Sequence, residues 1–152
     1  MLKVINTEEE WELVRERIRN RSDGSDYSIP RDTSGLWALV NTDTRGVLAG
    51  ISVAGMFWAK YLLGDEADVK ALLKAGSRHL QAQGFGSARI LGQFPDSAAL
   101  RQTVETYGLA QRVTRAQAVA RGMGGEWDAV QGTGQSLWWT TIDQLVTATA
   151  GF

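Results

Sequence analysis

The stretch Tyr61–Gly76, "YLLGDEADVKALLKAG", decides the fold because the spacing of its apolar residues changes within it. Before Gly64 the residues are aromatic and aliphatic, as in a strand. After Asp65 the small and apolar residues fall at i, i+3, i+4, i+7 and i+11, which are Val69, Leu72, Leu73, Gly76 and Leu80. This stretch therefore predicts a strand, a short turn and an amphipathic helix. In many α/β proteins such a junction binds a phosphate at the helix N-terminus.

Upstream of this junction the sequence predicts one helix and three strands. Thr7 to Glu10 fits a capping box that begins the helix, and the residues that follow on one face are Trp11, Val14 and Ile18. The helix ends in "RERIRNR", which is either a phosphate-binding basic cluster or a complement to the helix dipole. The polar segment Ser22–Gly35 is expected to be a loop. The strands, joined by short connections as in an antiparallel meander, are Leu36–Asn41, Val47–Gly55 and Met56–Leu63.

Downstream of the junction the pattern alternates again. The long helix is expected to end at Gly84, and Ser87–Phe94 is predicted as a strand. A helix follows, with Ser97 as its N-cap, one apolar face and an end at Gly108. The stretches "AQRVTRAQAVARGM" and "SLWWTTI" are predicted as a final strand pair. The sequence thus favours a mixed α/β (α+β) fold in a single domain, residues 1–152.

Two glycine- or threonine-rich segments near the C-terminus are expected to contain no helix. The segment Gly122–Gln135, "GMGGEWDAVQGTGQ", lies between two predicted strands and has no predicted helix to receive a phosphate. It is therefore predicted as a long hairpin or a flexible contact loop. The last residues, 144–152, are predicted as a flexible tail.

Composition excludes several classes of function. Sixteen lysines and arginines oppose seventeen acidic residues, so no overall field favours a nucleic-acid partner. The chain has no cysteine and one histidine, His79, and no metal site is expected. It shows no apolar leader and no run near the roughly 18 residues of a membrane span. A protein that is not secreted by a signal peptide and has no membrane-spanning segment is therefore expected.

The order of these elements resembles the GCN5-related N-acetyltransferase (GNAT) fold over nearly the whole chain. The long helix after the third meander strand and the shorter helix that ends at Gly108 carry this resemblance. With its tryptophan-rich sheet, the chain also resembles the small GNAT-like proteins of tailed bacteriophages, some of which are virion-associated. The family resemblance implies transfer of an acyl group from acyl-CoA to an amine.

The acyl-CoA loop of the family reads Arg/Gln-x-x-Gly-x-Gly/Ala before the long helix. The residues that align with it here are Gly64, Asp65, Glu66, Ala67, Asp68 and Val69. Three carboxylates in one turn oppose a diphosphate more strongly than the helix dipole, roughly +0.5 of a charge, attracts it. Val69 adds bulk where the backbone should approach the ligand. This loop is expected to cap a helix, with no cofactor bound.

No strong catalytic residue emerges. The tyrosine that protonates the leaving thiolate in many family members aligns with Val104, which has no acidic proton. Glu105 and Tyr107 are weak catalytic candidates, and packing at the helix end is the competing interpretation of Tyr107. Glu66 is expected to cap its helix, and His79 to pack at the edge of the apolar face.

Six tryptophans are the main compositional excess. Trp138 and Trp139 are adjacent in a strand, so their rings point to opposite faces of the sheet. If one face is uncovered, one ring is exposed and could form an interface, as could Trp127. The competing interpretation is that helices cover both faces.

These features lead to two main hypotheses and to a third, a host-interaction protein of the inhibitor type, which the sequence does not separate from the first. In the first, the chain is a catalytically degenerate GNAT-like domain, a structural or protein-interaction module of a bacteriophage virion or accessory protein. It would be cytoplasmic or virion-associated, with a protein partner or a second copy of itself. In the second, it is an active N-acetyltransferase that binds acetyl-CoA. The second requires the strands Met56–Leu63 and Ser87–Phe94 to splay apart, because the pantetheine would lie between them.

Overall fold

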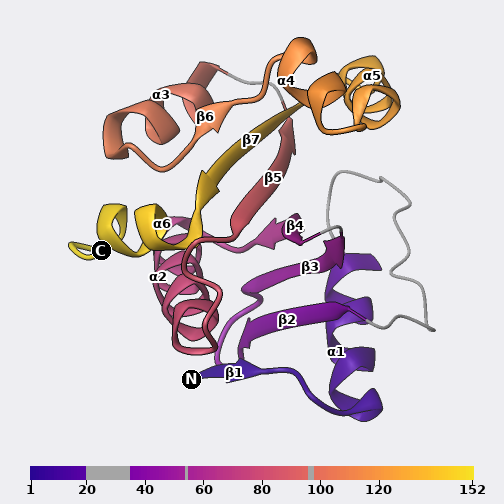
Figure 1. Cartoon of the computed structure of the whole chain (residues 1–152). Helices are drawn as coiled ribbons and strands as arrows, with labels where there is room; N and C mark the ends of the chain where they lie inside the picture. The colour runs from indigo at the N-terminus through magenta and orange to yellow at the C-terminus, as the bar shows by residue number, and fades with distance from the viewer. Residues whose placement is uncertain (20–34, 54, 96–97) are drawn as a thin grey trace.

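The computed structural model describes residues 1–19, 35–53, 55–95 and 98–152 and shows a mixed α/β fold with helices on both faces of one sheet (Figure 1). The strands are β1 (Leu2–Val4), β2 (Leu36–Asn41), β3 (Val47–Val53), β4 (Met56–Leu63), β5 (Arg89–Pro95), β6 (Gln111–Arg112) and β7 (Gln135–Thr141). The helices are α1 (Glu8–Arg19), α2 (Glu66–Ala82), α3 (Ala98–Tyr107), α4 (Arg115–Ala120), α5 (Gly124–Gly132) and α6 (Ile142–Ala148).

The described strands form a seven-stranded, mostly antiparallel sheet in the order β1-β2-β3-β4-β5-β7-β6. Strands β2 to β4 form the predicted meander, and β1, which was not predicted from the sequence, pairs antiparallel with β2. Strands β4 and β5 are parallel, and α2 makes the crossover between them, since parallel neighbours cannot be joined by a tight turn. Strand β7 then pairs antiparallel with both β5 and β6.

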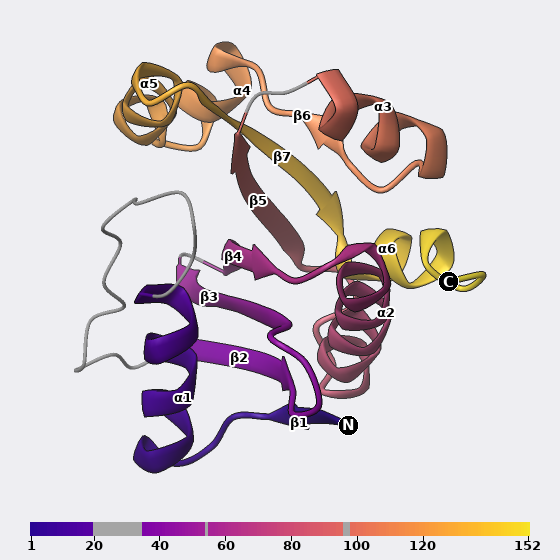
Figure 2. The ribbon, with the colours of Figure 1, turned by 180° about the vertical axis from the view of Figure 1, so that it is seen from behind.

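Each face of the sheet has its own helices, and Figures 1 and 2 show α1 and α2 on opposite sides. Helices α2, α3 and α6 cover one face, where Leu72, Val104 and Leu145 pack against strand residues such as Trp138. On the other face α1 covers the N-terminal strands, while α4 and α5 cover the C-terminal ones. Apolar residues therefore occupy both sides of the central strands.

A β-bulge interrupts β4 at Lys60. Ala59 lies opposite Gly50 and Tyr61 lies opposite Ala49, so Lys60 has no partner in β3. Gly50 makes this possible, because a Cβ there would lie 1.9 Å from the carbonyl oxygen of Trp58. A bulge bends its strand and shifts which side chains face each side of the sheet. The C-terminal end of β4 is thereby turned relative to its first half.

The N-terminal predictions are confirmed in the described residues. The amide of Glu10 donates to Thr7 Oγ1 at 3.2 Å, and Glu10 Oε1 accepts from the Thr7 amide at 3.0 Å, which completes the capping box. The predicted apolar face of α1 is buried. Gly84 follows α2 with φ +92°, as expected of a helix-ending glycine. Ser97 and nearly all of the predicted loop Ser22–Gly35 lie outside the described residues.

The C-terminal predictions are wrong in three places. The stretch predicted as the first strand of the final pair forms only the two-residue strand β6 before α4, so the pair with β7 is very short. The segment Gly122–Gln135, predicted as a hairpin or flexible loop, contains helix α5. The first residues of the tail 144–152, predicted to be flexible, lie in α6, and both Leu145 in this helix and its C-cap residue Thr149 are buried. Helices α4 and α6 begin at capping boxes, Thr114 with Gln117 and Thr141 with Gln144.

Candidate functional site

The entrance to α2 is formed by residues 64–69, the segment that the family resemblance aligns with an acyl-CoA loop. Helix α2 begins at Glu66, and Asp65 is its N-cap. The Asp65 carboxylate accepts a hydrogen bond from the Asp68 amide at 2.8 Å. Gly64 precedes the cap with φ +129°, and a Cβ there would lie 2.6 Å from that of Asp68. The loop therefore satisfies one of the free amides of the helix N-terminus with its own carboxylate.

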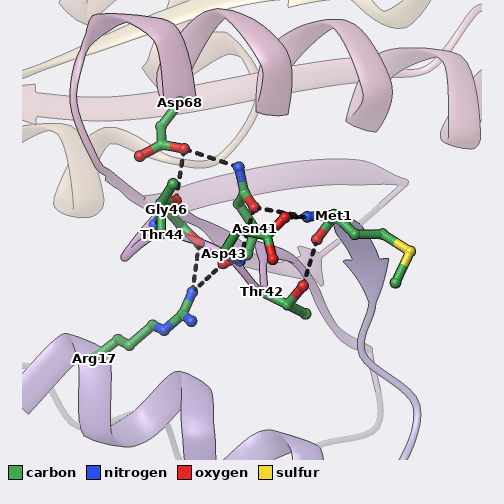
Figure 3. A network of polar contacts seen from close by, with 8 residues as sticks. All are labelled: Met1, Arg17, Asn41, Thr42, Asp43, Thr44, Gly46 and Asp68. Atoms are coloured by element: carbon green, nitrogen blue, oxygen red, sulfur yellow. Dashed lines mark hydrogen bonds and ion pairs between the residues drawn. The ribbon is translucent and has the colours of Figure 1, made fainter.

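Asp68 is held in a polar network between α2 and the β2–β3 turn (Figure 3). Its side chain is only 6% exposed, and Oδ1 accepts from Thr44 Oγ1 at 2.7 Å and from Asn41 Nδ2 at 3.2 Å. Gly46 in the same turn leaves room for it, since a Cβ at Gly46 would lie 3.0 Å from the Asp68 carboxylate. The carboxylate of Asp68 therefore fixes the turn to the helix.

The opposite side of the same turn is held by α1. Arg17 donates to the carbonyl oxygens of Asn41 and Gly46 at 2.8 and 3.0 Å (Figure 3). Arg15 is buried and donates to Glu8 and Glu12, both at 2.8 Å. Neither arginine is therefore left free for the phosphate site that the basic run allowed.

Glu66, the third carboxylate of the entrance, is exposed. It forms an ion pair with Lys70 at 3.2 Å, and this contact raises the pKa of Lys70. The Lys70 ammonium also lies 5.3 Å from the centre of the Tyr107 ring. One lysine thus offsets part of the negative charge, while Asp65 and Asp68 keep the first turn acidic.

Strands β4 and β5 separate beside this entrance. Their pairing covers only Met56–Ala59 with Arg89–Gly92, after which β5 continues along β7 alone. The bulge at Lys60 lies where the pairing stops. The splay that the acyltransferase hypothesis requires is therefore present.

An apolar cavity of about 110 Å³ lies at the splay. Leu62 from β4, Phe94 from β5 and Val104 from α3 line it, together with Val69 from the first turns of α2. Val69 thus brings an isopropyl group to the cavity wall, at the position where the resemblance to the acetyltransferase family predicted a need for glycine or alanine. The cavity can hold a small apolar group, and its lining side chains are nearly all apolar.

The weak catalytic candidates do not line this cavity. Val104, the residue that aligns with the tyrosine of the family, does line the cavity, but its side chain has no acidic proton. Tyr107 is 40% exposed, and its ring packs edge-on against Phe152 with 5.2 Å between centroids. Glu105 is exposed and lines a different groove, beside α6. His79 is half-buried on α2, next to Trp37 and Phe57 in a third groove.

Two of the three tryptophans proposed for an interface, Trp138 and Trp139, are buried, and the third, Trp127, is half-buried. Trp138 is 3% exposed on the α2 face, and its indole N–H donates to Ser136 Oγ at 2.9 Å. Trp139 is 7% exposed on the α4–α5 face. Trp127 is half-buried and donates to the carbonyl oxygen of Val113 at 3.0 Å. Helices cover both faces here, which is the competing interpretation from the sequence.

Comparisons with known proteins add no relative. No protein-family model matches the chain, and neither a curated protein nor a solved structure similar to it was found. Among the described residues, no cluster of three or more potential metal-binding side chains occurs. None of the helices that the structure describes is long and apolar enough to cross a lipid bilayer.

Proposed function

We propose that this chain is a catalytically degenerate GNAT-like domain that acts as a structural or protein-interaction module of a bacteriophage virion or accessory protein. The parallel β4–β5 pair, its splay and the helix that follows β4 support the GNAT-like part of the proposal. The observation that carries the loss of cofactor binding is the α2 entrance. There Asp65 caps the helix and Asp68 ties it to the β2–β3 turn.

The electrostatics of this entrance oppose a diphosphate. The helix N-terminus offers a partial charge of roughly +0.5, whereas its first turn and cap carry three carboxylates. Each carboxylate within about 4 Å of a phosphate oxygen would cost on the order of 1–4 kcal/mol. Moving Asp68 away to relieve this would break its hydrogen bonds to Thr44 and Asn41. Relieving the repulsion by moving the Asp68 carboxylate would therefore itself cost free energy.

The splay and its cavity favour a second candidate function, that of an active N-acyltransferase. In this case the pantetheine arm would lie between β4 and β5, and the diphosphate would be held outside the first turn of α2. The acid that protonates the thiolate would have to come from elsewhere than Val104. This candidate is weaker because it needs a substitute for both family sites.

A thermal-shift experiment with acetyl-CoA and pantetheine, run in parallel, distinguishes the two. The first proposal predicts no stabilisation by acetyl-CoA up to about 1 mM, because binding weaker than that adds less than about 0.4 kcal/mol to stability. Pantetheine lacks the diphosphate and is the matched control for repulsion at the entrance. A saturable shift with micromolar acetyl-CoA, with release of free CoA in the presence of amines, would establish the acyltransferase instead.

A further inference from the structure

Two arginines from different elements meet at the ring of Trp139. The guanidinium carbon of Arg89, at the start of β5, lies 4.4 Å from the centre of the ring. That of Arg121, which follows α4, lies 5.2 Å from the same centre. Trp139 itself is only 7% exposed. The strand and the helix end therefore bring two cations to one buried aromatic side chain.

Neither cation is neutralised within the part of the chain that the structure describes. Arg89 and Arg121 have no carboxylate within ion-pair distance there, and their side chains donate no hydrogen bond to a described residue. Arg115 in the same region is different, because it donates to both oxygens of Asp128 at 3.0 and 3.2 Å. The contrast shows that unpaired arginines are not general in this part of the fold.

Stacking on an aromatic ring leaves a guanidinium ready to bind an anion. The contact uses the flat π face, so the N–H groups at the edge remain available as donors. Those donors form a planar fork that matches a carboxylate or a phosphate. Two like charges near one ring also repel each other, and a bound anion would reduce that repulsion.

A groove beside Arg89 and Trp139, which Arg121 does not line, restricts the ligand. It has a volume of about 700 Å³ and is lined by Arg89 and Trp139 and by the polar side chains of Gln111 and Thr140. Glu105 and Asp143 also line it, so more than one negative charge on the ligand would meet repulsion. A ligand group with a single negative charge fits these walls better than a polyphosphate.

We propose that Arg89 and Arg121, which both contact the ring of Trp139, form a binding site for one carboxylate group. The carboxylate comes from a small organic acid or from an acidic side chain of a partner protein. This site is separate from the α2 entrance and does not depend on whether acyl-CoA binds.

The test is a titration of the intact protein, at constant ionic strength, followed by the NMR signals of the arginine Nε–H and tryptophan indole N–H groups. The probes are acetate, a short glutamate-rich peptide and inorganic phosphate. We expect saturable shifts of the Trp139, Arg89 and Arg121 signals with acetate and with the peptide. Peptide binding at least about tenfold tighter than acetate assigns the carboxylate to a protein partner, and equal binding assigns it to a small acid.

The variants make the test specific. Arg89→Gln and Arg121→Gln should each weaken binding by about tenfold or more, whereas the control Arg115→Gln should leave it unchanged. Arg89→Lys keeps the charge and the stacking but loses the planar fork, so it should bind with intermediate affinity and guard against a folding defect. Absence of saturable shifts would overturn the proposal. Tighter binding of phosphate than of acetate would also overturn it, as would an equal loss of affinity in the control Arg115→Gln.

Discussion

Replacing Asp68 with alanine tests whether this carboxylate is a structural tie. Asp68 is nearly buried and accepts hydrogen bonds from Thr44 and Asn41. A hydrogen bond to a charged group contributes about 1.5–3 kcal/mol. Thr44 is exposed enough for water to replace the lost acceptor in part, so each of the two hydrogen bonds should contribute near the lower end of that range. We expect Asp68→Ala to reduce the free energy of unfolding by about 3 kcal/mol.

The assay is urea denaturation, with Glu66→Ala as the matched control. Glu66 lies in the same helical turn but is exposed, and its i,i+4 pair with Lys70 should contribute about 0.3–0.5 kcal/mol. Comparing the two variants removes the general effect of a negative charge on the helix dipole. For a slope near 2 kcal/mol/M, the midpoint of Asp68→Ala should fall by about 1.5 M. Equal midpoints for the two variants would refute a structural role for Asp68.

Two further predictions concern the bulge and the N-terminal helix. Gly50→Ala should lower the free energy of unfolding by about 3 kcal/mol, because its Cβ would collide with the carbonyl oxygen of Trp58. The control Gly125→Ala in α5 has open space around it and should be neutral or stabilising. Similar melting temperatures for the two variants would be inconsistent with a bulge. The contact with Lys3, with further hydrogen bonds, lowers the pKa of Glu10 from 4.5 to about 2. Because the folded-state pKa is the lower one, Glu10 stabilises the fold above about pH 4.5, and this is lost as the pH falls toward 2. Urea midpoints at pH 7 and pH 3 should therefore differ less in Glu10→Gln than in the wild type, and an unchanged difference would contradict the pairing.

Local signals were sufficient for most elements in the first two thirds of the chain, although they missed the short strand β1. The capping box at Thr7, the change of period at Asp65 and the glycine at 84 each act within one turn of the chain. Such signals depend on neighbouring residues, so a single sequence contains them. The same kind of signal was present at Thr114 and Thr141, and recognising those capping boxes would have predicted α4 and α6.

The features that define the candidate sites depend on distant parts of the chain. The splay of β4 from β5 follows a bulge that needs Gly50 on the neighbouring strand. The alternation of Trp138 and Trp139 was predictable, but coverage of both faces depends on helices that were not. The Arg89–Trp139–Arg121 contact joins β5, β7 and the end of α4. The spacing of residues along the sequence does not predict such long-range contacts.

Isothermal titration calorimetry with acetyl-CoA most directly tests the claim that the carboxylates at the N-terminus of α2 prevent a diphosphate from binding there. The wild type should show no heat of binding at millimolar ligand. The variant Asp65→Gly with Glu66→Gly should also fail to bind, because Asp68 and Val69 keep their places. Micromolar binding by the wild-type protein, with a bound diphosphate contacting Ala67 and Val69 in a crystal, would contradict the account.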